Sequence, residues 1–187
     1  ASLRDDEKKL LASRSERVHV DVETAYLAAL LHDIGRFVLF QDQPEPFPAA
    51  DTTGFAGSSA LLCHEQEQSG WDHAEIGWRV CHAWNIPEHI AVLIRDHHVY
   101  DLDQHDELPM HHQHELTVLQ MADAISLVLT NVDDLQARSF EEIREVLRER
   151  CVHPRWPVVP LEPGELATLL PWIIDEADAM LSGLMLS

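Results

Sequence analysis

Apolar residues recur at three- and four-residue steps along much of the chain, which is the repeat of a helix that packs on one side. The strongest such stretch, AYLAALLHDIGRFVL, runs from Ala25 to Leu39. Its apolar positions predict a helix that is apolar around most of its circumference (Val22, Tyr26, Leu27, Leu30, Leu31, Ile34, Phe37 and Val38). We expect this helix to run without a break and to lie at the centre of a core.

The same repeat predicts further helices at residues 3–17, 59–68, 73–84, 87–98, 116–131, 139–150 and 165–182. Two helix starts carry a capping pattern, Asp72 with Glu75 and Ser139 with Glu142, and Gly183 is a predicted helix stop. No stretch shows the alternation of a strand, so we predict an all-α helical bundle. Because 187 residues suffice for one core and are few for two, we expect a single domain over residues 1–187.

Two long polar segments are predicted to be loops. Residues 41–58 contain prolines that prevent a helix (Pro44, Pro46 and Pro48). This segment has two open interpretations, a lid over a site or a variable surface excursion. Residues 101–114 carry several acids, but their spacing lacks the glycine and the final glutamate of a calcium loop.

Ionisable residues inside apolar helices indicate a metal. His32 and Asp33 lie side by side in the first apolar helix, and Asp123 is the lone acid of the helix at 116–131. A buried carboxylate without a partner is costly, and a divalent cation satisfies it together with a neutral imidazole. Gly35, which follows closely, allows a backbone or a ligand to approach.

Composition limits the partners and the compartment. The formal charge of -20 makes a nucleic-acid duplex an unfavourable partner. The three cysteines contain no CxxC pair, which favours a reducing cytoplasm over a disulfide framework. No signal peptide and no membrane-spanning run is evident. The unusual feature is the number of histidines, 13 in 187 residues.

Few of these histidines stand in a context that suggests a ligand. The adjacent pair His97-His98 ends one predicted helix, and His73 begins another. Three more lie in a polar run and are predicted to be solvated (His111, His112 and His114). The others have no supporting context (His19, His64, His82, His89, His105 and His153).

The order of these motifs resembles that of HD-superfamily domains. The matching motifs are LLHDIGR with His32 and Asp33, HAEIGW with His73, the Trp84-Asn85-Ile86-Pro87 break, His97-His98, and MADAI with Asp123. The closest resemblance is to the HDOD branch, and the histidine set also resembles that of the catalytic HD-GYP branch. The resemblance extends over residues 1–130.

This resemblance implies a helical bundle around one or two metal ions that hydrolyses phosphate esters. The implied ligands form two groups that share Asp33 (His32, Asp33 and Asp123; Asp33, His73, His97 and His98). Asp33 and Arg36 would be the catalytic residues, with Arg36 where catalytic relatives carry a lysine and able to grip a phosphate oxygen. Acids combined with imidazoles suit iron, manganese or a similar ion better than magnesium.

Two departures from the family pattern leave alternatives open. The segment 1–17 lacks the further metal-binding histidine that the family places before the HD helix, and VYDLDQHDELP follows His98 in place of a GYP segment. We expect a metal-dependent phosphohydrolase acting on a small phosphorylated substrate or nucleotide. The alternatives are a non-catalytic HDOD signalling module, with a signalling-protein partner or fused domains, and an acidic interaction scaffold without metal.

Overall fold

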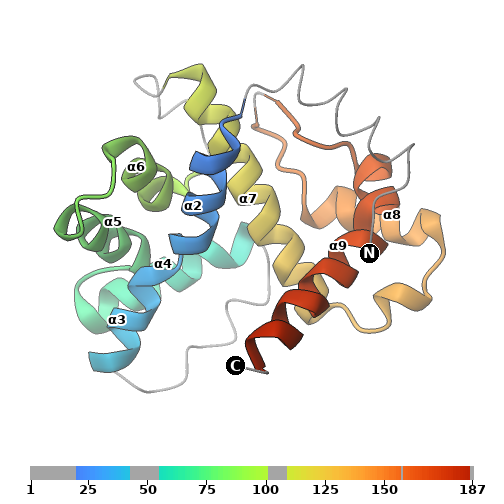
Figure 1. Ribbon diagram of the computed structural model, residues 1–187. Coiled ribbons are helices and arrows are strands. Elements are labelled where there is room, and N and C mark those ends of the chain that lie inside the picture. Colours follow the sequence, from blue (N-terminus) through green and yellow to red (C-terminus); the bar gives the residue numbers. More distant parts are fainter. Residues whose placement is uncertain (1–19, 43–54, 101–108, 157, 186–187) are drawn as a thin grey trace.

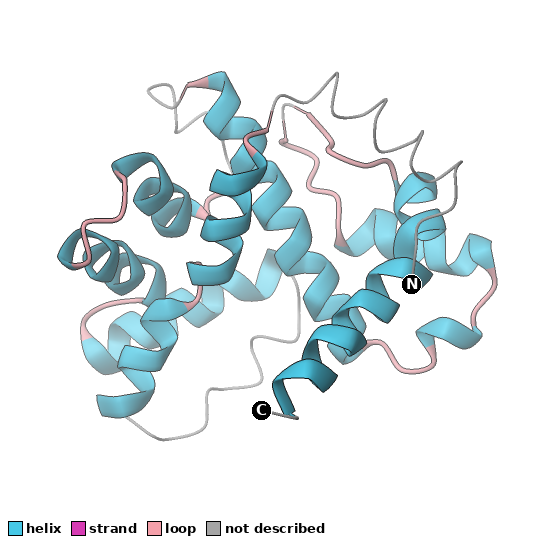
Figure 2. Ribbon diagram, viewed as in Figure 1, coloured by secondary structure: helices cyan, strands magenta, loops and turns pink. Residues whose placement is uncertain are grey.

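The computed structural model describes residues 20–42, 55–100, 109–156 and 158–185. Helices joined by turns and loops make up this part of the chain, and no strand occurs within it (Figure 2). The prediction of an all-α helical bundle is therefore confirmed. The predicted helix at 3–17 and most of the predicted loops at 41–58 and 101–114 lie outside the described residues.

The helices follow the predicted order, with differences at their ends and one break, between α2 and α3. Their bounds are α2 Val22–Leu31, α3 Ile34–Asp42, α4 Phe55–Ser69, α5 His73–Ala83, α6 Glu88–Asp96, α7 Met110–Asn131, the short 3-10 helix η3 Leu135–Ala137, α8 Phe140–Arg150 and α9 Pro163–Met185. Asp72 caps α5, and Ser139 forms a complete capping box with Glu142 at the start of α8, as predicted. Gly183 does not stop α9, which continues to Met185.

The predicted helix at Ala25–Leu39 is two helices, not one. The helical pattern breaks at His32 and Asp33, between α2 and α3, and the Arg36 amide donates to the Asp33 carbonyl across the turn. The two halves pack against different neighbours, since α2 contacts α6 and α7 whereas α3 contacts α5. The chain therefore changes direction at His32 and Asp33, which are two of the predicted metal ligands.

The expectation that this segment is central to a core is also wrong for much of its apolar surface. Only Thr24 and Ala28 are fully buried on α2, while Leu27 and Leu31 are partly buried against the core. Phe37 is 70% exposed, and other large apolar side chains of α2 and α3 are exposed as well (Val22, Tyr26, Leu30, Val38 and Phe40). The number of apolar side chains on these helices therefore did not determine which of them are buried. A side chain is buried only where a neighbouring helix packs against it.

Two hydrophobic clusters fill the interior, and α7 contributes to both. The first joins α2, α5 and α6 to the first half of α7, with Leu93, Ile94 and Leu116 fully buried. The second joins the second half of α7 to η3, α8 and α9, with Leu147 and Leu166 fully buried. In Figure 1, α7 runs between α5 and α6 on one side and α8 and α9 on the other.

A close contact between α3 and α5 places the turn at His32-Asp33 beside α5. A Cβ atom on Gly35 would lie 2.0 Å from the His73 carbonyl oxygen and 2.8 Å from the Gly77 amide nitrogen. Glycine at this position therefore lets the backbones of α3 and α5 touch, as the sequence predicted for Gly35. The contact fixes Asp33 next to the start of α5, where His73 lies.

No helix in the described ranges has the combined length and apolar character needed to cross a bilayer.

Candidate metal centre

Side chains from four parts of the fold meet at one place. The turn between α2 and α3 supplies His32 and Asp33, and the first residue of α5 supplies His73. The end of α6 supplies His97 and His98. Asp123 comes from the middle of α7. The six predicted ligand positions, separated by up to 91 positions in sequence, are thus neighbours in space.

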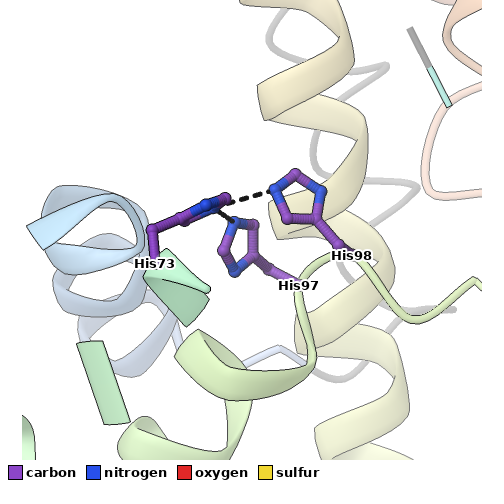
Figure 3. A group of neighbouring side chains, drawn as sticks. All are labelled: His73, His97 and His98. Carbon is purple, nitrogen blue, oxygen red and sulfur yellow. Dashed lines mark hydrogen bonds between the residues drawn. The ribbon is translucent and has the colours of Figure 1, made fainter. Parts of the chain in front are cut away.

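Three histidine rings form the buried side of this group. The Nε2 atom of His73 lies 3.3 Å from Nε2 of His97 and 3.0 Å from Nε2 of His98 (Figure 3). His73 and His97 are fully buried, and His98 is partly buried. These three residues offer ligand atoms close enough together to hold one metal ion.

A second group overlaps the first through His97. His32 Nε2 lies 3.5 Å from Asp33 Oδ2, and His32, Asp33 and His97 again offer ligand atoms within reach of one ion. The other Asp33 oxygen, Oδ1, lies 3.4 Å from His73 Nε2 and 3.9 Å from His97 Nε2. The two oxygens of Asp33 therefore face the two groups. Asp123 lies at the edge, with Oδ1 3.8 Å from His32 Nε2.

Each of the four rings has its Nδ1 atom engaged elsewhere. His32 Nδ1 lies 2.8 Å from the Ala29 carbonyl oxygen, and His97 Nδ1 lies 2.6 Å from the Ile94 carbonyl oxygen. The Nδ1 atoms of the other two rings lie near Glu65 Oε2, at 2.7 Å from His73, and Tyr100 Oη, at 3.3 Å from His98. Such partners fix the tautomer and the ring orientation of metal-binding histidines.

The resulting tautomers point lone pairs at one another. A carbonyl oxygen only accepts, so Nδ1 of His32 and of His97 carries the proton and Nε2 of each presents a lone pair. The Glu65 carboxylate has the same effect on His73. The Nε2 atoms of His73 and His97, 3.3 Å apart with no proton between them, repel unless a cation lies beside them. The donor set thus suits a metal ion.

The charges of the site favour neutral imidazoles at its buried side. Burial, followed by the charges of His73 and His32, lowers the pKa of His97 to about 3. Burial and the charge of His97 hold the pKa of His98 well below its usual range. For His32, burial acts to lower the pKa, but hydrogen bonding to Asp123 and the charge of Asp33 outweigh it and the pKa is raised. Neutral imidazole is the form that binds a metal.

Arg36 lies at the open side of the cluster. Its Nε atom is 3.4 Å from Asp33 Oδ1, and its side chain is partly buried. A guanidinium offers donors suited to a phosphate group. The structure therefore places Arg36 next to the predicted ligands.

The acids are less buried than the sequence analysis expected. The Asp33 side chain is 34% exposed and that of Asp123 is 15% exposed. Asp33 lies in the turn between α2 and α3 and is partly open to solvent. The cost of burying a carboxylate is therefore not a reason for Asp33 to need a cation. The fully buried members are instead His73 and His97, and the case for a metal rests on them.

Sequence reasoning missed Glu65, which supports His73. Its side chain is 2% exposed, and Oε2 accepts from both the backbone amide and the ring of His73. Glu65 lies on α4 in the polar run HEQEQ, which gives no local sign of burial. The turn between α4 and α5 brings it to His73, which is eight positions later in the chain.

The prediction that the histidines near residue 112 are solvated is wrong for two of them. The helix α7 begins at Met110, so this run is helical and not a loop. His114 is buried, and His112 is partly buried with Nδ1 2.8 Å from Glu115 Oε2 and its ring stacked on that of His89. Pro109 precedes the helix, where its missing N–H costs nothing.

Residues 8–100 match the family model of the HDOD domain. The chain therefore belongs to the HDOD family, a branch of the HD superfamily. The matched segment contains His32, Asp33, His73, His97 and His98, whereas Asp123 lies beyond it. Searches of curated proteins and of solved structures give no match.

Proposed function

We propose that this protein is a metal-dependent phosphohydrolase. The observation that carries the proposal is the convergence of three imidazole Nε2 atoms, those of His32, His73 and His97, on the Asp33 carboxylate, each ring having its Nδ1 atom held by another group. A side-chain arrangement that served packing alone would not bring unprotonated nitrogens this close together. Membership of the HD superfamily supports the same proposal.

The donor set suggests which ions the site would hold. His73, His97 and His98 would hold one ion and His32 with Asp123 another, with Asp33 between them because its two oxygens face the two groups. Imidazole with carboxylate suits iron, manganese or a similar first-row ion, whereas magnesium prefers oxygen ligands. When bound, such ions supply a water nucleophile at neutral pH and neutralise charge on phosphoryl oxygens.

The residues of the chain have distinct roles in this proposal. The exposed part of Asp33 lies where a substrate phosphate would enter, and Arg36 would bind a phosphate oxygen there through its guanidinium. His73 is held by Glu65 so that its ring orientation is set before any ligand arrives. A small phosphorylated molecule or nucleotide is the substrate class that these groups support.

A direct test combines metal analysis with turnover. We expect the purified full chain to contain near-stoichiometric iron or manganese, and to hydrolyse generic phosphodiesters or phosphomonoesters when supplied with either ion. Asp33→Ala should abolish turnover, while Asp178→Ala, which removes an exposed acid on α9, should leave it unchanged. Turnover that persists in Asp33→Ala would refute the proposal.

The alternative is a regulatory HDOD module that binds metal or another ligand without turning it over. Membership of the HDOD family and the lack of a histidine in residues 1–17 favour this reading. Stoichiometric metal without hydrolysis of any generic phosphoester would support the module, acting through a protein partner or fused domains. Absence of metal binding would refute the phosphohydrolase and leave either a module whose pocket binds another ligand or the acidic scaffold.

We also propose a reducing cytoplasm as the compartment. All three cysteines are free thiols, and two of them, Cys81 and Cys151, are buried apart from each other in the two different hydrophobic clusters. Such a distribution suits thiols that are kept reduced.

A further inference from the structure

A buried glutamine connects the end of α6 to the chain after α8. Gln120, on α7, is 1% exposed, and its Nε2 atom donates to the Val99 carbonyl oxygen at 2.9 Å. Its Oε1 atom accepts from Trp156 Nε1 at 2.7 Å, and Trp156 is 7% exposed. We call this arrangement of Gln120, Trp156 and the Val99 carbonyl the Gln120 brace. Val99 directly follows His98.

Tyr100, the residue after Val99, makes a second connection to the segment between α8 and α9. Tyr100 Oη lies 3.3 Å from Nδ1 of His98, and the Tyr100 ring stacks on that of His153 with centroids 5.1 Å apart. His153 is three residues before Trp156, in the segment between α8 and α9. The two residues that directly follow His98 are thus both linked to the segment between α8 and α9.

Both polar atoms of the Gln120 side-chain amide are hydrogen-bonded, Nε2 as a donor and Oε1 as an acceptor, so only one orientation of the amide satisfies the brace. Each buried polar atom in it has its partner, and loss of one bond leaves a desolvated donor or acceptor behind. Gln120 is also one helical turn before Asp123, so the same stretch of α7 faces both the His98 segment and His32. A shift of α7 would therefore move the brace and Asp123 together.

We propose that Gln120 and Trp156 are positioning residues for the metal centre, through which the segment after α8 holds the His97-His98 pair in place. This inference rests on the proposed metal site. Trp156 lies outside residues 8–100, so the brace assigns a role to a part of the chain that the HDOD match does not cover. The ligand concerned is a divalent first-row ion.

The test measures manganese binding by the full chain after removal of metal with a chelator. Trp156→Phe removes the indole N–H and keeps an aromatic ring, and Gln120→Met removes both side-chain bonds at similar volume. Trp84→Phe is the matched control, since Trp84 is 58% exposed and outside the brace. We expect Trp156→Phe and Gln120→Met to weaken Mn²⁺ binding about tenfold, as loss of an outer-shell partner does, and Trp84→Phe to match wild type.

The double variant shows whether the two residues act as one unit. Gln120→Met with Trp156→Phe should bind Mn²⁺ no more weakly than Gln120→Met alone, because the second change removes a bond that is already lost. Additive losses in the double variant would contradict a shared brace. Mn²⁺ affinities of both single variants equal to that of Trp84→Phe would overturn the proposal outright.

Hydrogen exchange of the metal-free protein separates failure of the brace from failure of the proposed function. We expect amides at 97–100 to exchange faster in Trp156→Phe than in wild type, with those of α8 unchanged. Equal acceleration everywhere, or none at 97–100, would refute the brace whether or not metal binds. A wild-type protein that binds no Mn²⁺ would refute the proposed function, and the exchange result would still decide the brace.

Discussion

Gly35→Ala is the substitution that most directly tests the packing on which the site depends. The new Cβ would lie 2.0 Å from the His73 carbonyl oxygen, whereas ordinary contact begins at 3.4 Å. The obstacle is backbone, so α3 and α5 must separate by roughly 1.4 Å to reach ordinary contact, a large shift for a closely packed interior. Overpacking of this kind costs about 1–3 kcal/mol.

Helix propensity acts in the opposite direction but is smaller. Alanine in place of glycine stabilises a helix interior by at most about 1 kcal/mol, and Gly35 is only the second residue of α3. We therefore expect a net loss of about 2 kcal/mol in the free energy of unfolding. For a chain of this length that loss lowers the midpoint of thermal unfolding by about 4–8 °C.

Two other glycines provide graded controls for the same chemical change. Gly183→Ala adds a methyl group with nothing within 4 Å and should leave stability unchanged or slightly higher. Gly77→Ala brings Cβ to 3.0 Å from Ile94 Cγ2, which is the end of a side chain, so its cost should lie between the other two. Urea unfolding monitored by circular dichroism ranks the three variants.

Gly35→Ala should also weaken manganese binding, because the displaced carbonyl belongs to the predicted ligand His73. A Gly35→Ala protein that is as stable as Gly183→Ala would refute the close contact of α3 and α5. Normal stability together with lost metal binding would show that Gly35 acts on the ligand site and not on packing.

Three further results are expected. Glu65→Gln removes the carboxylate that orients His73 and should weaken Mn²⁺ binding by about 10–100-fold, measured by calorimetry; unchanged affinity would exclude a supporting role. Ser139→Ala removes the N-cap of α8 and should cost about 1 kcal/mol in urea unfolding. Hydrogen bonds from Ser139 lower the pKa of Glu142, so their stabilisation is present at neutral pH and is lost as the pH falls below the ordinary value of 4.5; the variant deficit should therefore shrink in acid to that of the cap alone, and an undiminished deficit would contradict this. Burial raises the pKa of the Cys151 thiol to about 12, so at pH 8 a thiol reagent should modify exposed Cys63 and leave Cys151 unmodified until the protein unfolds.

The sequence by itself determined the helices and the residues worth testing. Helix periodicity and capping are local, so the order of helices, the Asp72 cap and the Ser139 capping box were predictable. Histidines and acids at particular points of those helices also indicated which side chains to examine. The need for glycine at position 35 followed from its place beside the HD pair.

Tertiary packing alone decided which surfaces are covered and which groups support the site. The break at His32-Asp33 and the exposure of Phe37 depend on where α5, α6 and α7 lie, and an apolar repeat carries no such information. Gln120 reaches its partners over 21 positions to Val99 and 36 positions to Trp156, so no local window contains both partners. Glu65 is only eight positions from His73, but its burial depends on the helices that pack around it, and a polar run carries no sign of that.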